Sequence, residues 1–239
     1  MRVAEHVEQV ERPRWGSFAL VCGAYLVATT GEQLLSPLYP TASKDLGIGV
    51  GQAGIVFGLL TISIAVFNLV GGLLLRRVSV SVLVRTAALV GAVGSATTAT
   101  THSFGQLIIG QMVLGASAGL FFPAGLQAVA LLAGPARKGF AMGIYGVAFS
   151  GGLLLAAVLG AVGSTHDWRT AFWIAAALGG AAAVGGAGSA RSKPVRGSHT
   201  KFSFRTVMAL PTAVGTVLAV CQYGAIPFLT TFAVNRWGL

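Results

Sequence analysis

The sequence consists of apolar blocks of about 20 residues, separated by short segments that carry most of its charged side chains. A helix of that length crosses the hydrocarbon core of a bilayer. Of the 239 residues, 54% are hydrophobic and only 9% are charged, which is too little charge to cover a soluble domain of this size. Because segments in lipid must satisfy their own backbone hydrogen bonds and these blocks are too long for barrel strands, the pattern predicts an all-α integral membrane protein.

Seven membrane spans are predicted, and six of them precede a basic linker. The spans cover residues 16–40, 52–75, 81–100, 104–133, 139–163, 170–190 and 207–233. The predicted domains are a tail (1–15), a six-helix bundle (16–190), the linker (191–205) and a seventh helix with its outer end (206–239). The tail shows no cleavable signal peptide, so the first span itself is expected to direct insertion.

The positive charges predict the orientation of these spans. With strict alternation, 13 of the 16 Lys and Arg residues fall on the side of the N-terminus. The sequence therefore predicts a multi-pass protein of the inner (plasma) membrane with its N-terminus in the cytoplasm. The net charge of +10 is interpreted as loops that face the negative side of a membrane, and no nucleic-acid partner is expected. For the linker, contact with lipid headgroups is the alternative to a simple cytoplasmic loop.

The sequence shows no pattern typical of a catalytic or metal site. It has no nucleophile motif and no glycine loop between a strand and a helix. The four histidines fall in tails or loops, at His6, His102, His166 and His199. Cys22 and Cys221 lie far apart in apolar runs, which favours buried small side chains over a disulfide or a metal site. We therefore expect no enzyme activity, no cofactor and no metal.

Glu32 is the one acidic residue of six that falls well inside a predicted span. A carboxylate is costly to expose to lipid, so its side chain is expected to face the bundle interior or a watery cavity. Steps of three or four residues place it on one helical stripe with Cys22, Tyr25, Thr29, Ser36 and Tyr39. Such a stripe is expected to line water or other protein.

Five short stretches occur in order at the ends of the spans or inside them. They are SPLYP (36–40), GGLLLRR (71–77), LIIGQMVLGASAG (107–119), GGLLLAAVLG (151–160) and DWRTAFW (167–173). Together with six spans, a basic loop and a seventh span, they resemble the signatures of the major facilitator superfamily of secondary transporters. The resemblance implies the six-helix N-terminal bundle of that fold plus the first helix of a second half, so that the chain is expected to be truncated.

Two of these stretches depart from the family pattern at charged residues. In the loop signature Gly-x-x-x-Asp-Arg-x-Gly-Arg-Arg, Gly72 and Arg77 match, but Arg76 replaces the Asp. In the family this Asp helps to lock one conformation, a role that Arg76 cannot reproduce. In the fourth-helix signature Gly115 matches, but Gln111 replaces an Arg that is linked to proton transfer in drug/proton antiporters.

The remaining stretches agree better with the family. Trp168, Arg169 and Phe172 match the Trp-Arg-x-x-Phe opening of the sixth helix, and SPLYP resembles the Pro-x-x-Pro that ends helix one in many members. In the fifth helix Gly152 and Gly160 match the antiporter signature, but two alanines replace its Gly-Pro.

The resemblance implies that helices one, four and seven line the central cavity. At about 1.5 Å rise per residue, Glu32, Gln111 and Gln222 are expected at similar depth. The candidate site for substrate or a proton comprises Glu32, Gln111, Gln222, Tyr223, Tyr25 and Thr29. The alternatives are ordinary hydrogen bonds between helices for the two glutamines, and a structural role for Glu32.

The expected function is proton-coupled secondary active transport of a small solute across the lipid bilayer, in uptake or efflux. Alternating access in this family needs two six-helix halves. We therefore expect the chain to need a missing C-terminal half or a second copy. The alternative is a truncated fragment that does not transport, or a membrane interaction protein.

Overall fold

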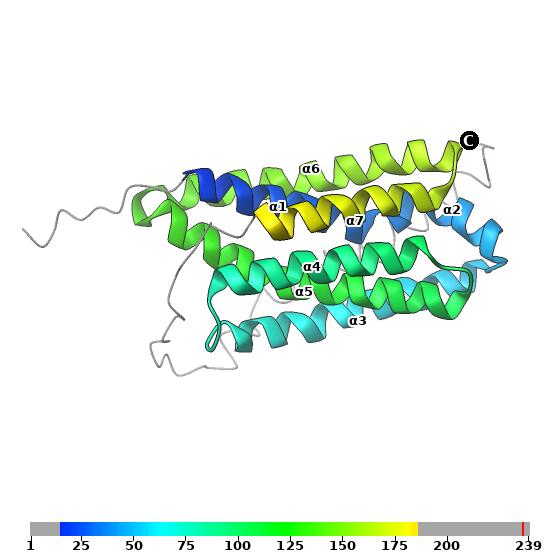
Figure 1. The fold of residues 1–239 in the computed structure, drawn as a ribbon, viewed down its shortest axis with the longest axis horizontal. Helices are drawn as coiled ribbons and strands as arrows, with labels where there is room; N and C mark the ends of the chain where they lie inside the picture. The colour runs from blue at the N-terminus through cyan, green and yellow to red at the C-terminus, as the bar shows by residue number, and fades with distance from the viewer. Residues whose placement is uncertain (1–14, 186–235, 237–239) are drawn as a thin grey trace, which may run out of the picture.

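The computed structural model describes residues 15–185 and residue 236. Within that part of the chain the fold is all-α, as the sequence predicts (Figure 1). The elements are α1 (Trp15–Gln33), α2 (Leu35–Leu46), α3 (Val50–Leu74), α4 (Val80–Ala99), α5 (Phe104–Ala133), η1 (Pro135–Arg137), α6 (Lys138–Thr165) and α7 (Trp168–Gly185). The predicted linker and the predicted seventh span lie outside the described residues.

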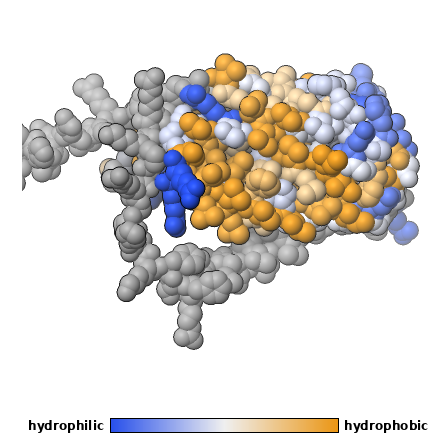
Figure 2. All heavy atoms as spheres, turned by 60° about the horizontal axis from the view of Figure 1, so that its bottom comes forward, coloured by the Kyte–Doolittle hydropathy of each residue, from blue (hydrophilic) through white to orange (hydrophobic). Residues whose placement is uncertain are grey.

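Five stretches of the described chain are long and apolar enough to cross a membrane. They are Trp15–Leu46, Gly51–Leu74, Val80–Ala99, Phe104–Ala133 and Lys138–Thr165. Figure 2 shows a broad hydrophobic band on one face of the bundle, with hydrophilic residues toward both ends. α7 lies at the sixth predicted span, whose expected end at residue 190 is outside the described part.

The prediction that the first span ends at residue 40 is wrong, because α2 continues to Leu46. Pro37 stands in the first turn of α2, where a backbone N–H has no partner within the helix in any case. Pro40 lies inside the helix without ending it. The helix ends at Gly47, whose φ of 64° is left-handed and whose N–H donates to the carbonyl of Ser43.

The helices pack around α1, α4 and α5. α3 lies against α5, α5 against α4, α4 against α7, and α1 against α6 and α5. In the view of Figure 1, α1, α2, α6 and α7 form the upper part of the bundle, and α3, α4 and α5 form the lower part. Segments distant in sequence are thus neighbours, which places the polar stripe of α1 beside both α5 and α6.

Glycines permit the closest approaches between helices. A Cβ added at Gly115 of α5 would stand 2.6 Å from the backbone oxygen of Leu60 in α3. A Cβ added at Gly152 of α6 would stand 2.6 Å from the backbone oxygen of Leu26 in α1. Small residues at such crossings allow backbone contact where lipid removes the hydrophobic drive for association.

Two hydrophobic clusters fill the interior, one toward each end of the bundle. The cluster toward the start of α1, here called the Trp15 end, includes Phe18, Phe121 and Tyr145. The cluster toward the end of α2, here called the Asp45 end, includes Tyr39 and Trp168. Between them, small and polar side chains predominate, and the candidate site lies at that level.

Candidate functional site

The polar stripe of α1 faces protein in the described structure. Thr29 is 2% exposed, Glu32 7% and Ser36 8%, and Tyr25 is partly buried. The amide Nε2 of Gln33 donates to Oε1 of Glu32 over 2.9 Å. The stripe therefore avoids lipid, as a carboxylate in a membrane helix requires.

Glu32 lies beside an irregularity in the hydrogen bonding of the first span. α1 ends at Gln33 and α2 begins at Leu35, but Leu34 keeps helical backbone angles (φ −63°, ψ −32°), so the helical path is continuous and only the hydrogen-bond pattern is interrupted. Pro37 has no N–H and cannot donate to the carbonyl of Gln33, four residues earlier. The sequence thus places a carboxyl side chain and a backbone carbonyl without its helical donor side by side.

Thr29 and Thr30 attach α1 to α6. Thr30 Oγ1 donates to the backbone oxygen of Leu26 over 2.8 Å and lies within hydrogen-bond distance, 3.2 Å, of that of Gly152 in α6. Thr29 occupies the space that a Cβ at Gly152 would need. Thr29 therefore contributes packing at this crossing, next to Glu32 on the same helical face.

Tyr25 belongs to a stack of aromatic rings from three helices. Its ring is parallel to those of Tyr145 in α6 and Phe121 in α5, with centroids 4.1 Å and 5.5 Å away and interplanar angles of 7°. Phe149 of α6 stands 5.9 Å from Tyr25. The stack closes the space between α1, α5 and α6 on the Trp15 side of Glu32.

Gln111 lies in α5 with no exposed surface. Its amide Nε2 donates to Oγ1 of Thr98 in α4 over 3.4 Å, and its Oε1 has no partner among the residues described. Leu114, about one turn further along α5, lies against Gly31 of α1. Gln111 and Glu32 are therefore on neighbouring helices at nearly the same height.

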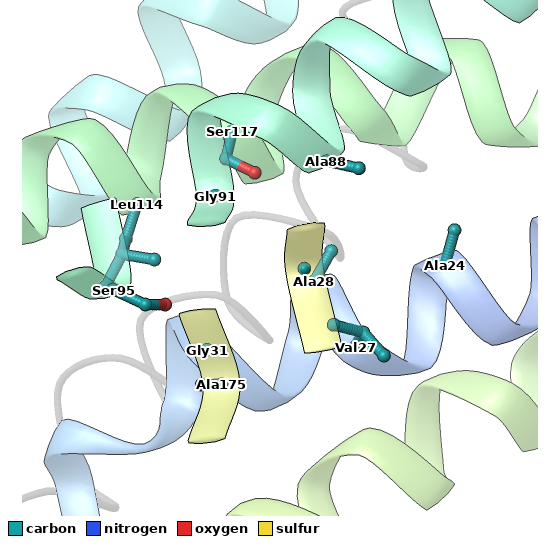
Figure 3. Close-up of a pocket in the computed structure, with 11 residues that line it drawn as sticks. Ala24, Val27, Ala28, Gly31, Ala88, Gly91, Ser95, Leu114, Ser117 and Ala175 are labelled. Carbon is teal, nitrogen blue, oxygen red and sulfur yellow. The ribbon is translucent and has the colours of Figure 1, made fainter. Parts of the chain in front are cut away.

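A narrow pocket lies between α1, α4, α5 and α7, close to the height of Glu32 and Gln111 (Figure 3). It is lined from α1, α4, α5 and α7, and Figure 3 shows Ser95, Leu114 and Gly31 close together at one side. Its other labelled residues include Ala28, Gly91 and Ser117. Gly31 precedes Glu32, so the pocket and the carboxyl stripe occupy different sides of one helix.

The other predicted site residues of helix seven, Gln222 and Tyr223, lie outside the described residues. The part of the candidate site within the described residues comprises Tyr25, Thr29 and Glu32 of α1 and Gln111 of α5. Among the residues that the structure covers, no group of three or more His, Cys, Asp and Glu side chains is placed to hold a metal ion.

The stretch between α3 and α4, at the Trp15 end, contains Arg76 and Arg77, and both residues are exposed. Gly72, which matches the family signature, is exposed and has no atom within 4 Å of an added Cβ. The neighbouring Gly71 instead makes the close contact, because an added Cβ would stand 3.0 Å from Pro123 of α5.

The helix-six stretch forms a polar cluster at the Asp45 end. Arg169 Nη1 lies 2.8 Å from Oδ2 of Asp45, and Arg169 Nη2 donates to the carbonyl of Thr101 over 2.8 Å. Trp168 Nε1 donates to the same Asp45 oxygen over 3.2 Å, while Phe172 packs edge-on against Trp168. The cluster ties the ends of α2 and α7 to the turn between α4 and α5.

Sequence reasoning did not find Asp45, Thr101 or Thr98 as partners. Asp45 and Arg169 are separated by more than a hundred residues, and nothing in their local sequence shows that they pair. For Thr98, the spacing along α4 places its hydroxyl on the same side as Ser95, which is the signal that could have suggested a buried polar edge.

The sequence and the fold of this chain have relatives among known proteins. The sequence profile of the family described as Major Facilitator Superfamily matches residues 21–238. The chain is 25% identical over 160 residues to the probable sulfoacetate transporter SauU of Cupriavidus necator, covering 66% of this chain and 37% of that protein. It is 25% identical over 174 residues to the hexuronate transporter of Escherichia coli K12, covering 72% of this chain and 40% of the other.

The quinolone resistance protein NorA of Staphylococcus aureus is 24% identical over 162 residues, covering 68% of this chain and 42% of NorA. In each of these three comparisons the match spans about two-fifths of the relative. A bacterial homologue of the human lysosomal transporter Spinster, in an inward-facing and occupied conformation, superposes with a TM-score of 0.77 at 16% identity. That superposition covers 95% of this chain and 55% of the homologue, and it shows a shared fold.

Proposed function

From the premise that this chain belongs to the major facilitator superfamily, we propose that it takes part in secondary active transport of a small solute, with Glu32 carrying the proton. The observation that supports this role is the position of Glu32. Its carboxyl group is almost fully buried in the first span, whereas Asp45 and Asp167 lie exposed at the Asp45 end. Carboxyl groups inside membrane bundles mark ion and proton pathways.

The missing backbone hydrogen bond next to Glu32 supports the same proposal. Interrupted membrane helices in transporters place backbone groups that lack helical partners at the binding site. Here the carbonyl of Gln33, which lacks its helical donor because Pro37 has no N–H, is adjacent in sequence to the carboxyl of Glu32. In this proposal, the proton carried by Glu32 would therefore lie next to the bound solute.

The test of Glu32 compares wild type with Glu32→Gln and Glu32→Asp, each combined with a complementary second half, in proteoliposomes that carry an imposed pH gradient. The solute panel includes sulfoacetate, a hexuronate and a quinolone, because relatives are named for these. Glu32→Gln should abolish pH-driven flux at unchanged expression, and Glu32→Asp should keep part of it. Full pH-driven flux in Glu32→Gln would refute the role.

We further propose that transport requires a complementary second half. The chain matches about two-fifths of each of the three relatives named above, and alternating access in this family uses two halves around one cavity. The second half would come from a longer or separate polypeptide, or from a second copy. Sustained flux by the purified 239-residue chain as a proven monomer would overturn this requirement.

The alternative function, a membrane protein that interacts without transporting, is favoured by the same partial match. It predicts no flux of any solute, even when a complementary half from a relative is supplied. Restored flux in that mixture would exclude it.

For orientation, we propose that the Trp15 end faces the cytoplasm of the inner (plasma) membrane. Exposed Arg76, Arg77, Arg137 and Lys138 all lie at that end, and cytoplasmic loops are enriched in such residues. The test uses two cysteine variants, Ala136→Cys at the Trp15 end and His166→Cys at the Asp45 end, both at exposed positions. An impermeant maleimide should label only His166→Cys in intact cells, and the reverse pattern would invert the topology.

A further inference from the structure

We propose that the Trp15 end of the bundle binds one anionic phospholipid where α1 meets α6. The phosphate of the lipid contacts Arg137, and one of its acyl chains lies along the exposed face of α6. The partner is a membrane lipid, so this role goes beyond the transport of a solute. It follows from a cation that is held over an aromatic ring beside an exposed apolar surface.

The guanidinium of Arg137 is held in place by the ring of Trp15. Its central carbon lies 5.9 Å from the ring centroid, within the range of a cation–π contact. Trp15 meets Phe18 and Phe140 edge-on, with ring centroids 5.5 Å and 6.4 Å away. Phe18 is 4% exposed, so this group of rings is anchored in the core. Arg137 itself is exposed, and its charge therefore stands at a defined place on the surface.

The hydrogen-bond donors of Arg137 remain available to a ligand. Among the residues that the structure describes, no oxygen atom accepts a hydrogen bond from its side chain or forms an ion pair with it. The acids in that part of the chain are Glu32, inside the first span, and Asp45 and Asp167, at the opposite end. A guanidinium presents five N–H donors in a planar fork that matches phosphate oxygens. Lys138, also exposed, adds a second positive charge next to it.

An apolar track on α6 begins about one turn after Arg137. Phe140, Val147 and Leu154 are 66%, 70% and 67% exposed, and steps of seven residues place them on one face of the helix. Gly143 lies between the first two, and nothing stands within 4 Å of a Cβ added there, so the surface between these side chains is open. From its first to its last residue the track measures about 21 Å. That length exceeds one leaflet of a hydrocarbon core about 30 Å thick.

This combination fits an amphiphile with an anionic head better than a soluble anion. A phosphate bound at Arg137 places the acyl chains of its lipid against the track, in the direction in which α6 enters the membrane. Arg76 and Arg77 at the same end are also exposed, and exposed leucines of α3 precede them. Within the described chain, however, neither of their guanidinium groups lies over a ring. A side chain that is already held loses less freedom on binding, which favours Arg137 as the site.

The first experiment detects the lipid by quenching of tryptophan fluorescence. The full chain is placed in phosphatidylcholine nanodiscs that contain a small fraction of brominated lipid, either phosphatidylglycerol or phosphatidylcholine. The chain has four tryptophans, so the signal of Trp15 is taken as the difference between wild type and Trp15→Phe. Brominated phosphatidylglycerol should bind near Trp15 about fivefold or more tightly than brominated phosphatidylcholine. Equal quenching by the two lipids would overturn the proposal.

The second experiment removes the positive charges in pairs. Arg137→Gln combined with Lys138→Gln should abolish the preference for phosphatidylglycerol over phosphatidylcholine. The matched control, Arg76→Gln combined with Arg77→Gln, removes the same charge from the same end and should keep the preference. All four residues are exposed, and thermal unfolding checks that both variants fold. An equal loss in the two variants would mean that lipids respond to the charge of this end as a whole, and would refute a site at Arg137.

The third experiment tests the apolar track and the other possible occupants of this face. Phe140→Ala keeps both charges but removes the first side chain of the track, so quenching by brominated phosphatidylglycerol should weaken. Glycerol phosphate, which is the soluble headgroup without acyl chains, should not restore the fluorescence. If it did so, the site would bind a soluble anion and the lipid assignment would be wrong. The preference should also persist when a complementary second half is added; its loss would show that the second half covers this face, and would overturn the proposal.

Discussion

The two ends of the first span are held by different kinds of contact. Toward the Trp15 end, Tyr25 is held by parallel rings from α5 and α6. At the Asp45 end, α2 is held by an ion pair and hydrogen bonds to Arg169 and Trp168. Ring stacking depends on shape and burial, whereas the ion pair depends on charges that remain partly in water, with Asp45 44% exposed.

The comparison indicates how stability is distributed along the bundle. Phe121 has 0% exposure, so its removal leaves a cavity among rigid rings. The charged partners at the other end can exchange their contacts for water at little cost. We therefore expect the rings to contribute more to the free energy of unfolding, and the charged cluster to fix which helix ends meet.

The largest effect is expected for Phe121→Ala. Loss of a fully buried ring should lower the free energy of unfolding by about 4 kcal/mol. Denaturant unfolding in detergent, followed by circular dichroism, measures the change. The control is Phe140→Ala at a 66% exposed position of α6, which should change it little. Equal effects at the two positions would contradict a ring stack that stabilises the fold.

The next effect is expected for Gly125→Ala. The added Cβ would collide with the hydroxyl of Tyr145 and stand 2.9 Å from Phe121, so the stack must shift. Overpacking of this kind costs about 2 kcal/mol. Gly143→Ala in α6 is the matched control, since nothing lies within 4 Å of its added Cβ and alanine favours a helix. A Gly125 variant as stable as the Gly143 variant would show that the rings move freely.

A smaller effect is expected for Arg169→Gln at the Asp45 end. The change removes the ion pair with Asp45 and the bond to Thr101, and should cost about 1 kcal/mol because the pair is partly in water. Lys44→Gln, at an exposed position nearby, serves as control. If Arg169→Gln destabilised the protein more than Phe121→Ala, the proposed ranking of the two ends would be reversed.

The smallest effect is expected from salt. Raising sodium chloride to about 0.5 M should weaken the Asp45–Arg169 pair by a few tenths of a kcal/mol and leave the ring stack unaffected. The free energy of unfolding, measured for wild type, Arg169→Gln and Phe121→Ala at low and at high salt, separates the contribution of the ion pair from that of the ring stack. Only Arg169→Gln should lose the salt dependence; its persistence there would place the sensitive charges elsewhere.

The sequence predicted the helices better than their contacts. Long apolar blocks with basic residues between them are enough to place α3, α4, α5 and α6 to within a few residues. The sequence does not predict the extension of α2 past Pro40, because a Pro-x-x-Pro pattern is typical of a helix end, whereas Pro37 here occupies a tolerated first-turn position.

The candidate site was predicted only in part. The spacing along α1 placed Glu32, Thr29 and Tyr25 on one face, which follows from helical periodicity alone. The partner of Gln111, Thr98, depends on how α4 crosses α5, and no periodicity within either helix encodes that crossing. The same holds for Asp45 and Arg169, whose pairing depends on where two distant helix ends meet.

The hydrogen bond that Pro37 cannot donate makes the bending stiffness of the first span vary along its length. A continuous helix resists bending along its whole length, but a missing backbone hydrogen bond lowers that stiffness locally. Beyond Leu34, α2 is anchored by Asp45 to α7; before it, α1 is anchored by Tyr25 to α5 and α6. If the two anchored ends of the first span move relative to each other, the helix should therefore bend near Leu34, and Glu32 is two residues from that position.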